Sequence, residues 1–221
     1  DVARDKDGQV RKEQDFRMAE ELMYGKAAND LERLENQTDK ITKSLKENGI
    51  TVEDLDEFLY NTHAKERNAV IRERTEGKND SGSGKTDEQV DKYFAGLSAS
   101  KRAKLEASAV TVREILQDTR NAMVELGLET KETIEAFEEM FSDYVPLQGK
   151  SQDEADMTYS PYPNGGTGFS VSGATTKKAK GRFTETENIV AQVIAQNAAV
   201  RIKGRTNEAM NALYELALNN P

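Results

Sequence analysis

The apolar residues between Leu105 and Leu126 recur at alternating intervals of four and three along the chain. This spacing constrains the fold more than any other feature of the sequence, because it places the apolar side chains on one narrow face of a helix. The same intervals recur between Leu31 and Leu45, whereas alternation with a period of two is almost absent. The sequence therefore predicts an all-α fold, in the form of an elongated bundle with long, heptad-patterned helices.

These two stretches form apolar seams of the kind through which helices associate in coiled coils. Only 36% of the residues are hydrophobic, so we expect a thin core that leaves the seams partly available to other chains. The positions expected to form this association seam are Leu31, Leu34, Ile41, Leu45, Leu105, Val112, Leu116 and Met123.

Capping residues indicate where the helices begin and end. Serine and threonine accept a hydrogen bond from the first turn of a helix, and glycine readily takes the left-handed conformation that ends one. The predicted N-caps are Thr51, Thr86, Ser98 or Ser100, Thr130 and Thr184, with capping boxes completed by Gln89 and Glu187. Gly49 and Gly127 are the predicted ends of the helices that precede them.

The predicted organisation has an N-terminal long helix of coiled-coil type over residues 1–50 and a helical bundle over residues 51–148. Residues 149–183 are rich in Gly, Ser, Thr and Pro, and their scattered apolar residues offset little of the entropy that ordering would cost. They are predicted to form a flexible loop. A C-terminal long helix over residues 184–221 then packs on the bundle.

Composition excludes several classes of function. The chain has no cysteine, so it contains neither disulfides nor thiolate metal sites, and its net charge of -9 disfavours contact with nucleic-acid backbones. The sequence has no apolar run of the roughly 20 residues needed to span a bilayer, and no secretion signal. Because it starts at Asp1 and ends directly after a strongly helical stretch, we expect it to be a piece of a longer polypeptide.

The stretch from Gly82 to Thr86 reads GSGKT and is similar to the end of a phosphate-binding loop. In that motif another glycine stands five residues before the one that precedes the lysine, and a buried strand leads into the loop. Here Asn79 occupies the glycine position, and the charged stretch before the loop is predicted to be helical. The sequence therefore favours a flexible connection between helices, in which Lys85 has no nucleotide-binding role.

The sequence carries no constellation typical of an enzyme. His63 is the only histidine, and it lies among polar residues, where a cap or a salt-bridge partner is more common than a catalyst. Zinc requires about four N or S ligands. A calcium loop aligned on Gly8 would have Ala3 and Gln14 at its first and twelfth positions, which require carboxylates. We therefore predict no catalytic residue, no cofactor and no metal site.

Several stretches nevertheless occur in an order that resembles a known family. They are LYNTHAKERNAVIRER, the loop GSGKTDEQ, YVPLQG, and a C-terminal stretch that ends in LYELALNNP. Together they resemble a helical domain of the large polyvalent proteins of bacteriophages and mobile elements, among them long internal virion proteins that are ejected with DNA. The resemblance covers roughly residues 55–221. Its motif positions are His63, Glu66, Arg67, Asn68, Gly82, Ser83, Gly84, Tyr144, Val145, Pro146, Leu147, Leu213, Leu216, Asn220 and Pro221.

The chain departs from the family pattern at Lys85, where the family often has Met, and at Arg205 and Asn207, which follow the K-N-R of the last helix only loosely. The resemblance implies a structural role for the motif residues, within a non-catalytic assembly segment of a protein that travels from the virion interior to the host cell. It implies partners among other virion proteins or copies of the same chain, contacted through the helical seams. A cytoplasmic coiled-coil adaptor and a nucleotide-binding protein that uses Lys85 are the alternatives.

Overall fold

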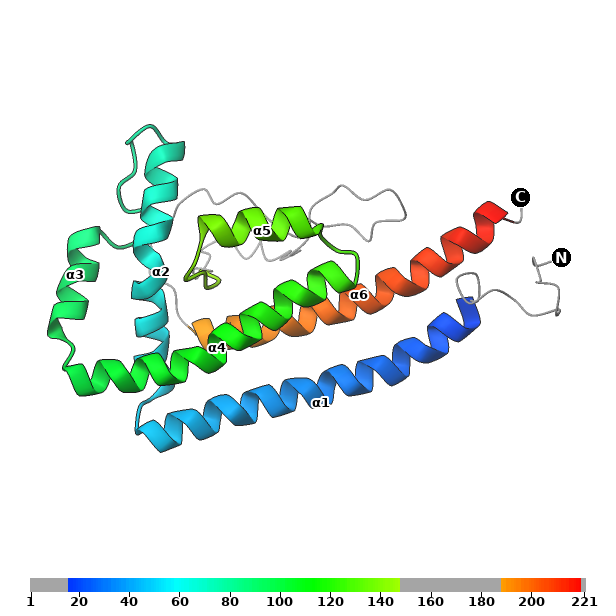
Figure 1. Ribbon diagram of the computed structural model, residues 1–221, viewed down its shortest axis with the longest axis horizontal. Helices are drawn as coiled ribbons and strands as arrows, with labels where there is room; N and C mark the ends of the chain where they lie inside the picture. Colours follow the sequence, from blue (N-terminus) through cyan, green and yellow to red (C-terminus); the bar gives the residue numbers. More distant parts are fainter. Residues whose placement is uncertain (1–15, 148–187, 220–221) are drawn as a thin grey trace, which may run out of the picture.

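The computed structural model describes residues 16–147 and 188–219, and all regular elements within these two ranges are helices (Figure 1). The predicted all-α class is confirmed. The helices are α1 (Phe16–Asn48), α2 (Val52–Arg74), α3 (Asp87–Gly96), α4 (Ala99–Glu125), α5 (Lys131–Met140) and α6 (Ile189–Asn219). The predicted flexible loop, over residues 149–183, lies outside the described residues.

Side-chain caps begin α2 to α5 at residues that the sequence predicts. Thr51 Oγ1 accepts a hydrogen bond from the backbone N–H of Asp54, whose carboxylate accepts one from the backbone N–H of Thr51 in return. These bonds satisfy donors that a helix leaves unpaired in its first turn. The caps of the next three helices are Thr86, Ser98 and Thr130.

Glycines end α1 and α4 as predicted. Gly49 and Gly127 have φ values of 62° and 65°, in the left-handed region that favours glycine. After α1, the backbone N–H of Ile50 donates to Leu45 O (3.1 Å), and that of Gly49 donates to Lys46 O (3.3 Å). This pair of bonds closes the last turn of α1 and directs the chain into α2.

Three long helices, α1, α4 and α6, lie side by side, and each contacts the other two (Figure 1). α1 and α6 run in opposite directions. α2 crosses one end of this layer, α3 lies beside α2, and α5 lies against α4. α1 therefore belongs to the same helical body as α4 and α6.

The larger apolar core lies where α1, α2, α4 and α6 meet. Its centre includes fully enclosed side chains such as Phe58 of α2, Leu105 of α4 and Val193 of α6. A smaller core, around Met123 and Val200, joins α4 to α6 further along. The positions of the predicted association seam that are buried in these two cores are Ile41, Leu45, Leu105, Val112, Leu116 and Met123. In this conformation they hold the chain's own helices together and offer no surface to a partner.

The buried face of α1 differs from the predicted seam. Leu31 is 58% exposed and does not lie on the same face as Ile41, which is buried. Asp30, one position before the predicted Leu31, turns inward instead, and Gln37 does so as well. The reason is that their side chains meet charged partners on α6 and α4. This corrects the seam in the first half of α1.

α6 begins at Ile189, later than the predicted cap at Thr184, which lies outside the described residues. Asn188, directly before the helix, has a φ of 57°. The cap of α6 comes from another helix, because the carboxylate of Asp56 in α2 accepts a hydrogen bond from the backbone N–H of Val190 at 2.8 Å. Burial raises the pKa of Asp56, and this bond opposes the rise.

Candidate functional site

His63, the only histidine of the chain, is enclosed by aromatic rings. Its side chain is 1% exposed, and the rings of Phe141 and Tyr144 meet its imidazole edge-on at 5.4 and 5.5 Å. Its Nδ1 atom lies 3.2 Å from a carboxylate oxygen of Glu66, one turn further along α2. Burial lowers the pKa of His63, although Glu66 opposes the shift. The imidazole is therefore held neutral near pH 7.

Glu66 connects this histidine to the turn that follows α5. Its Oε1 atom accepts hydrogen bonds from the hydroxyl of Ser142 (2.6 Å) and from the backbone N–H groups of Ser142 (3.1 Å) and Asp143 (3.3 Å). Burial raises the pKa of Glu66, but the bonds from His63 and Ser142 outweigh burial and leave that pKa below its usual value. We name this group the histidine clasp, which consists of His63, Glu66, Phe141, Ser142 and Tyr144.

The histidine clasp contains a serine, a histidine and a carboxylate, but their order does not suit nucleophilic catalysis. In a catalytic triad the serine hydroxyl bonds the histidine, and the histidine bonds the carboxylate. Here the hydroxyl of Ser142 donates to Glu66 itself. His63 is closed off from solvent, so a substrate has no access to its imidazole. The group fixes the turn after α5 against α2.

A second polar group joins the glycine-rich loop to α2. The fully buried side chain of Asn68 accepts a hydrogen bond from the backbone N–H of Ser83 (2.8 Å). Its amide group donates to Lys85 O (2.9 Å) and to a carboxylate oxygen of Asp87 (2.8 Å). The Asn68 side chain thus forms hydrogen bonds with both the loop and Asp87, the first residue of α3. We name this group the asparagine clasp, which consists of Tyr60, Arg67, Asn68, Gly82, Ser83, Lys85 and Asp87.

The loop lies directly against α2. Arg67 Nε donates to Gly82 O (3.2 Å), and the hydroxyl of Tyr60 donates to Ser83 O (3.0 Å). A Cβ atom on Gly82 would lie 2.6 Å from Cγ1 of Ile71, so no larger residue fits this approach. The loop is therefore held in place by α2, which corrects the prediction of a flexible connection between helices.

Four consecutive backbone N–H groups of this loop, from Ser83 to Thr86, are bonded within the chain, which leaves them unavailable to a phosphate. These bonds run from Ser83 N to Asn68 Oδ1, from Gly84 N to Ser81 O, from Lys85 N to Ser83 Oγ and from Thr86 N to Gln89 Oε1. The ammonium of Lys85 lies 4.8 Å from the centre of the Tyr60 ring and 3.9 Å from Glu57. A phosphate-binding loop instead directs its amides and its lysine at the ligand.

We therefore expect no binding of Mg-ATP or Mg-GTP at this loop. Isothermal titration of the wild-type chain should give no saturable heat at micromolar nucleotide, and Lys85→Ala should give the same trace. Micromolar binding that disappears in Lys85→Ala would show that the loop opens and that its amides are available after all.

A charged layer that the sequence did not predict lies between α1, α4 and α6. At its centre, Asp118 of α4 accepts hydrogen bonds from Arg201 of α6 (2.7 Å) and Arg33 of α1 (2.6 Å). Arg201 also donates to Asp30 of α1 (3.2 Å), which accepts a further bond from Arg205 (3.0 Å). The side chains of Arg201 and Asp118 are 8% and 24% exposed. The layer thus joins all three long helices, and its pairs through Arg201 are largely shielded from water.

Two amide side chains complete the charged layer. Gln37 of α1 and Asn197 of α6 donate to the same carboxylate oxygen of Asp118, at 3.0 and 3.1 Å. Burial raises the pKa of Asp118, but the hydrogen bonds from Arg201 and Asn197 outweigh burial and leave that pKa lowered. A sequence signal was available, because Asn197 and Arg201 stand on the same helix face as the apolar Val193. Polar residues at core positions of a helix require partners.

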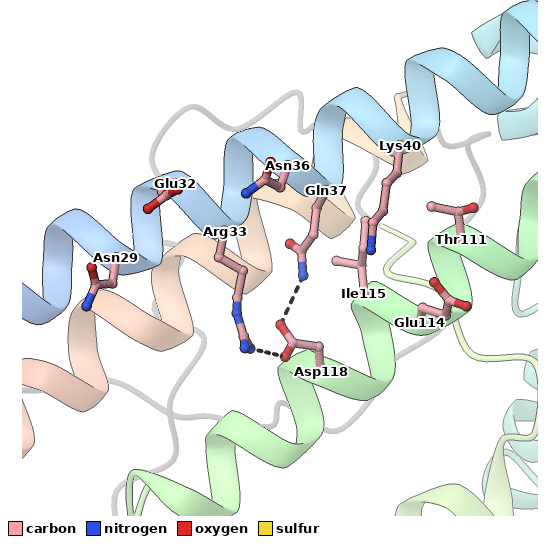
Figure 2. A pocket seen from close by; sticks show the side chains of 10 residues that line it. All are labelled: Asn29, Glu32, Arg33, Asn36, Gln37, Lys40, Thr111, Glu114, Ile115 and Asp118. Atoms are coloured by element: carbon pink, nitrogen blue, oxygen red, sulfur yellow. Dashed lines mark hydrogen bonds and ion pairs between the residues drawn. The ribbon is translucent and has the colours of Figure 1, made fainter.

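Beside the charged layer, an open groove of about 540 Å³ separates α1 from α4 (Figure 2). Arg33 and Gln37 reach from α1 to Asp118 along one part of it (Figure 2). The lining residues are Asn29, Glu32, Arg33, Asn36, Gln37, Lys40, Thr111, Glu114, Ile115 and Asp118. They carry charges of both signs, so α1 and α4 are joined along this stretch by polar contacts more than by apolar packing.

Seven of the fifteen motif positions lie in the two clasps. The members within the clasps are His63, Glu66, Arg67, Asn68, Gly82, Ser83 and Tyr144, and the loop also holds Gly84 at a φ of 103°. Val145 and Pro146 are buried directly after the histidine clasp, and Leu147 packs against the larger core. The C-terminal motif does not join them, because Leu213 is 38% exposed and the last two positions lie outside the described residues.

Within the described ranges, no group of three or more potential ligand side chains is placed to hold a metal ion. The described helices also include none with the length and apolar character of a membrane span. No protein-family model, curated protein or solved structure matches the chain.

The buried imidazole predicts a pH dependence of stability. Because the pKa of His63 lies below its usual 6.5 in the folded chain, the unfolded chain binds more protons below about pH 6.5. The free energy of unfolding should therefore fall as the pH drops from about 7 to about 5. The charged groups around His63 are Glu66, Arg67 and Asp143. Since the chain has one histidine, His63→Leu should lose this part of the dependence, which urea unfolding at several pH values would measure. A wild-type stability that stays constant over this range would mean that the imidazole is not held neutral.

Proposed function

We propose that this chain is a non-catalytic structural and assembly segment of a large internal virion protein of a bacteriophage, delivered with DNA into the host cell. In this proposal it resides in the virion interior and then in the host, and it associates with its own copies or with other virion proteins. Its long helices form an elongated, heptad-patterned bundle. It contributes no specific nucleic-acid recognition, no catalytic residue and no cofactor site.

The observation that supports a non-catalytic role is how the motif residues use their polar groups. His63 and Glu66 contact each other and the turn after α5, and Asn68 makes three hydrogen bonds to the glycine-rich loop and to α3. The side chains of His63 and Asn68 are 1% and 0% exposed. A catalytic acid, base or nucleophile must reach its substrate. The side chains of His63, Glu66 and Asn68 instead hold helices and turns together.

The bacteriophage setting is proposed from the order of the motifs along the chain. The stretch from His63 to Asn68, the glycine-rich loop and the stretch from Tyr144 to Leu147 occur in the order that the resemblance describes. The contact between Glu66 and the residues before Tyr144 spans 76 positions of the chain. Motif stretches that lie far apart in the sequence but contact each other in the fold hold each other in position. Such contacts support a helical scaffold shared with the family that the motifs resemble.

Association through helix surfaces is supported by exposed aliphatic side chains. Ile202 of α6 is 68% exposed, Leu31 of α1 is 58% exposed, and Leu218 of α6 is 57% exposed. Burial of such side chains in a helix–helix contact stabilises that contact by removing apolar surface from water. Because six positions of the association seam are enclosed in the chain's own cores, we expect the exposed residues to contribute to contacts with partners.

The location of the full-length protein that contains this segment tests the proposal. Antibodies against the segment should detect that protein in purified virions, and particles that have released their DNA should have lost it. Detection in the cytoplasm of host cells but never in virions would overturn the proposal and would favour a coiled-coil adaptor.

A further inference from the structure

We propose that α1 is an exchangeable helix, and that two copies of this chain associate by each docking α1 on the α4–α6 face of the other. The exchange rests on the self-association proposed above, and it adds to the exposed aliphatic side chains a contact surface between two copies of this chain. Domain exchange reuses the contacts of the closed chain, so a second copy is complementary to the site. The connection after α1, the polar character of its interface and the groove beside it all favour exchange.

Only three residues, Gly49, Ile50 and Thr51, connect α1 to α2. Gly49 has a φ of 62°, and a Cβ atom at this position would meet nothing within 4 Å. Thr51 caps α2 through its own side chain, so α2 keeps its first turn when α1 moves away. A short hinge of this kind, between two helices with separate end signals, is a typical place for domain exchange.

The middle of α1, from residue 28 to residue 40, is joined to α4 and α6 mainly through charged side chains. Leu34 is the only large aliphatic side chain of this stretch that is partly buried, since Leu31 is exposed. Ion pairs of this stretch with the other helices are Asp30–Arg201, Asp30–Arg205 and Arg33–Asp118, and Lys26 just before it pairs with Glu208. Polar groups regain hydrogen bonds to water when a helix leaves, so such an interface separates more readily than an apolar one.

This interface is also incompletely packed. The groove of Figure 2 lies between α1 and α4 along the same stretch. The side-chain oxygen of Gln37 is buried beside it and has no hydrogen-bond partner in the part of the chain that the structure describes. A buried acceptor without a partner is unfavourable, and water satisfies it once the helices separate. When α1 separates from its own chain, Ile41 and Leu45 lose their apolar contacts in the larger core, and they form the same contacts again on the partner chain.

The α4–α6 face selects another α1 helix by its charge pattern. Asp30 of α1 faces the basic Arg201 and Arg205, and Arg33 of α1 faces the acidic Asp118. Without α1, the largely buried Arg201 would lose its bond to Asp30. The α1 helix of a second copy restores these pairs in the same register, whereas a helix of unrelated sequence does not. The charge pattern therefore favours the α1 helix of a second copy of this chain as the occupant of the vacated α4–α6 face.

Two single-cysteine variants test the exchange. The hydroxyl oxygens of Ser44 in α1 and Ser108 in α4 lie 3.0 Å apart, and the chain has no cysteine of its own. We would mix Ser44→Cys chains with Ser108→Cys chains at high concentration, refold them together and oxidise the mixture. In closed chains the two thiols lie in different molecules and do not meet, whereas in the exchanged dimer they face each other. We expect a disulfide-linked dimer of the two variants as the main cross-linked species on a non-reducing gel, since dimers that form from one variant alone do not place two cysteines together.

The matched control mixes Thr130→Cys chains with Thr133→Cys chains. Their hydroxyl oxygens also lie 3.0 Å apart, but both positions belong to the start of α5, so exchange of α1 does not bring them together across chains. The dimer linked between positions 44 and 108 should exceed this control several-fold. Cross-linking at the control level at every concentration would overturn the exchange. Sedimentation of the same samples separates the two proposals. If dimers form but the disulfide between positions 44 and 108 does not, the chain associates and the exchange of α1 is wrong.

A measurement on the unmodified chain covers the case in which a cysteine variant does not fold. Zero-length coupling can join Lys26 of α1 to Glu208 of α6, whose charged groups lie 3.0 Å apart. In a refolded mixture of isotopically light and heavy chains, coupled peptides with one light and one heavy partner are expected. Finding only light–light and heavy–heavy pairs would contradict the exchange.

Discussion

Arg201→Met is expected to lower the free energy of unfolding by about 3 kcal/mol, because it removes the most buried member of the ion pairs and leaves the carboxylates of Asp118 and Asp30 with fewer partners. The Arg201 side chain is 8% exposed and donates to Asp118 at 2.7 Å and to Asp30 at 3.2 Å. Methionine retains much of the length of arginine without its charge. The loss stays near the lower end of the range for buried pairs, since Asp118 keeps Arg33 and Asp30 keeps Arg205. Urea unfolding followed by circular dichroism measures it.

Arg33→Met is the matched control for this variant. Arg33 bonds the same carboxylate of Asp118 at 2.6 Å, but its side chain is 53% exposed. Exposed ion pairs contribute about 1 kcal/mol or less, so the control should lose much less stability than Arg201→Met. Equal losses in the two variants would mean that burial does not determine which pairs of the charged layer matter.

The acid sensitivity of the chain should change in Arg201→Met as well. Burial raises the pKa of Asp118, but in the wild-type chain the hydrogen bonds from Arg201 and Asn197 outweigh burial and leave that pKa lowered. A carboxyl group with a lowered pKa contributes stability above its unfolded pKa and loses it as the pH falls through the folded one. Without Arg201 the folded pKa of Asp118 rises, so less of this stability is present at neutral pH and its loss on acidification should begin at a higher pH.

Helix boundaries could be predicted from the sequence because the interactions that set them are local. Thr51, Thr86 and Ser98 each accept a hydrogen bond from the backbone three positions further on. Gly49 and Gly127 end helices through their own backbone conformation. Such features depend only on neighbours in the chain, so a short pattern of residue types is enough to identify them.

The buried face of α1 could not be predicted in the same way, because it depends on a distant helix. Hydropathy favours Leu31 for the buried face, yet this side chain is 58% exposed. Asp30 turns inward because Arg201 lies on α6, 171 positions later in the sequence. The spacing of apolar residues places Asp30 on the surface of α1, because that spacing does not depend on the charges of another helix such as α6. The charged layer was missed for this reason.

The motif residues were identifiable, but their partners were not. The polar neighbours of His63 indicated a salt-bridge or capping role, but the imidazole is buried and neutral, so its contact with Glu66 is a hydrogen bond. Nothing near His63 in the sequence indicates that Phe141 and Tyr144 enclose it. The glycine-rich loop was predicted to be flexible from its composition, whereas Asn68 holds it by accepting a bond from Ser83 and donating one to Lys85, 15 and 17 positions away. Composition describes the tendency of a segment alone, and a single buried amide on the adjacent helix overrides that tendency.

Gly204→Ala is expected to cost a net free energy of unfolding of about 2 kcal/mol, although alanine usually stabilises a helix relative to glycine. Gly204 is buried in α6 where this helix passes the end of α4. A Cβ atom at this position would lie 2.5 Å from Cβ and 2.7 Å from Cγ of Leu126. Because Cβ of Leu126 is fixed to the backbone, a change of rotamer does not remove the overlap, and the two helices must move apart. Urea unfolding again measures the loss.

Gly25→Ala is the matched control, because it makes the same chemical change inside another long helix. A Cβ atom on Gly25 would meet nothing within 4 Å, so this variant should gain up to about 1 kcal/mol from the higher helix propensity of alanine. The two substitutions should therefore shift stability in opposite directions. If Gly204→Ala were also stabilised, α6 and α4 could not approach each other as closely as they do here. The spacing of the face on which α1 docks would then differ, because α4 and α6 together form that face.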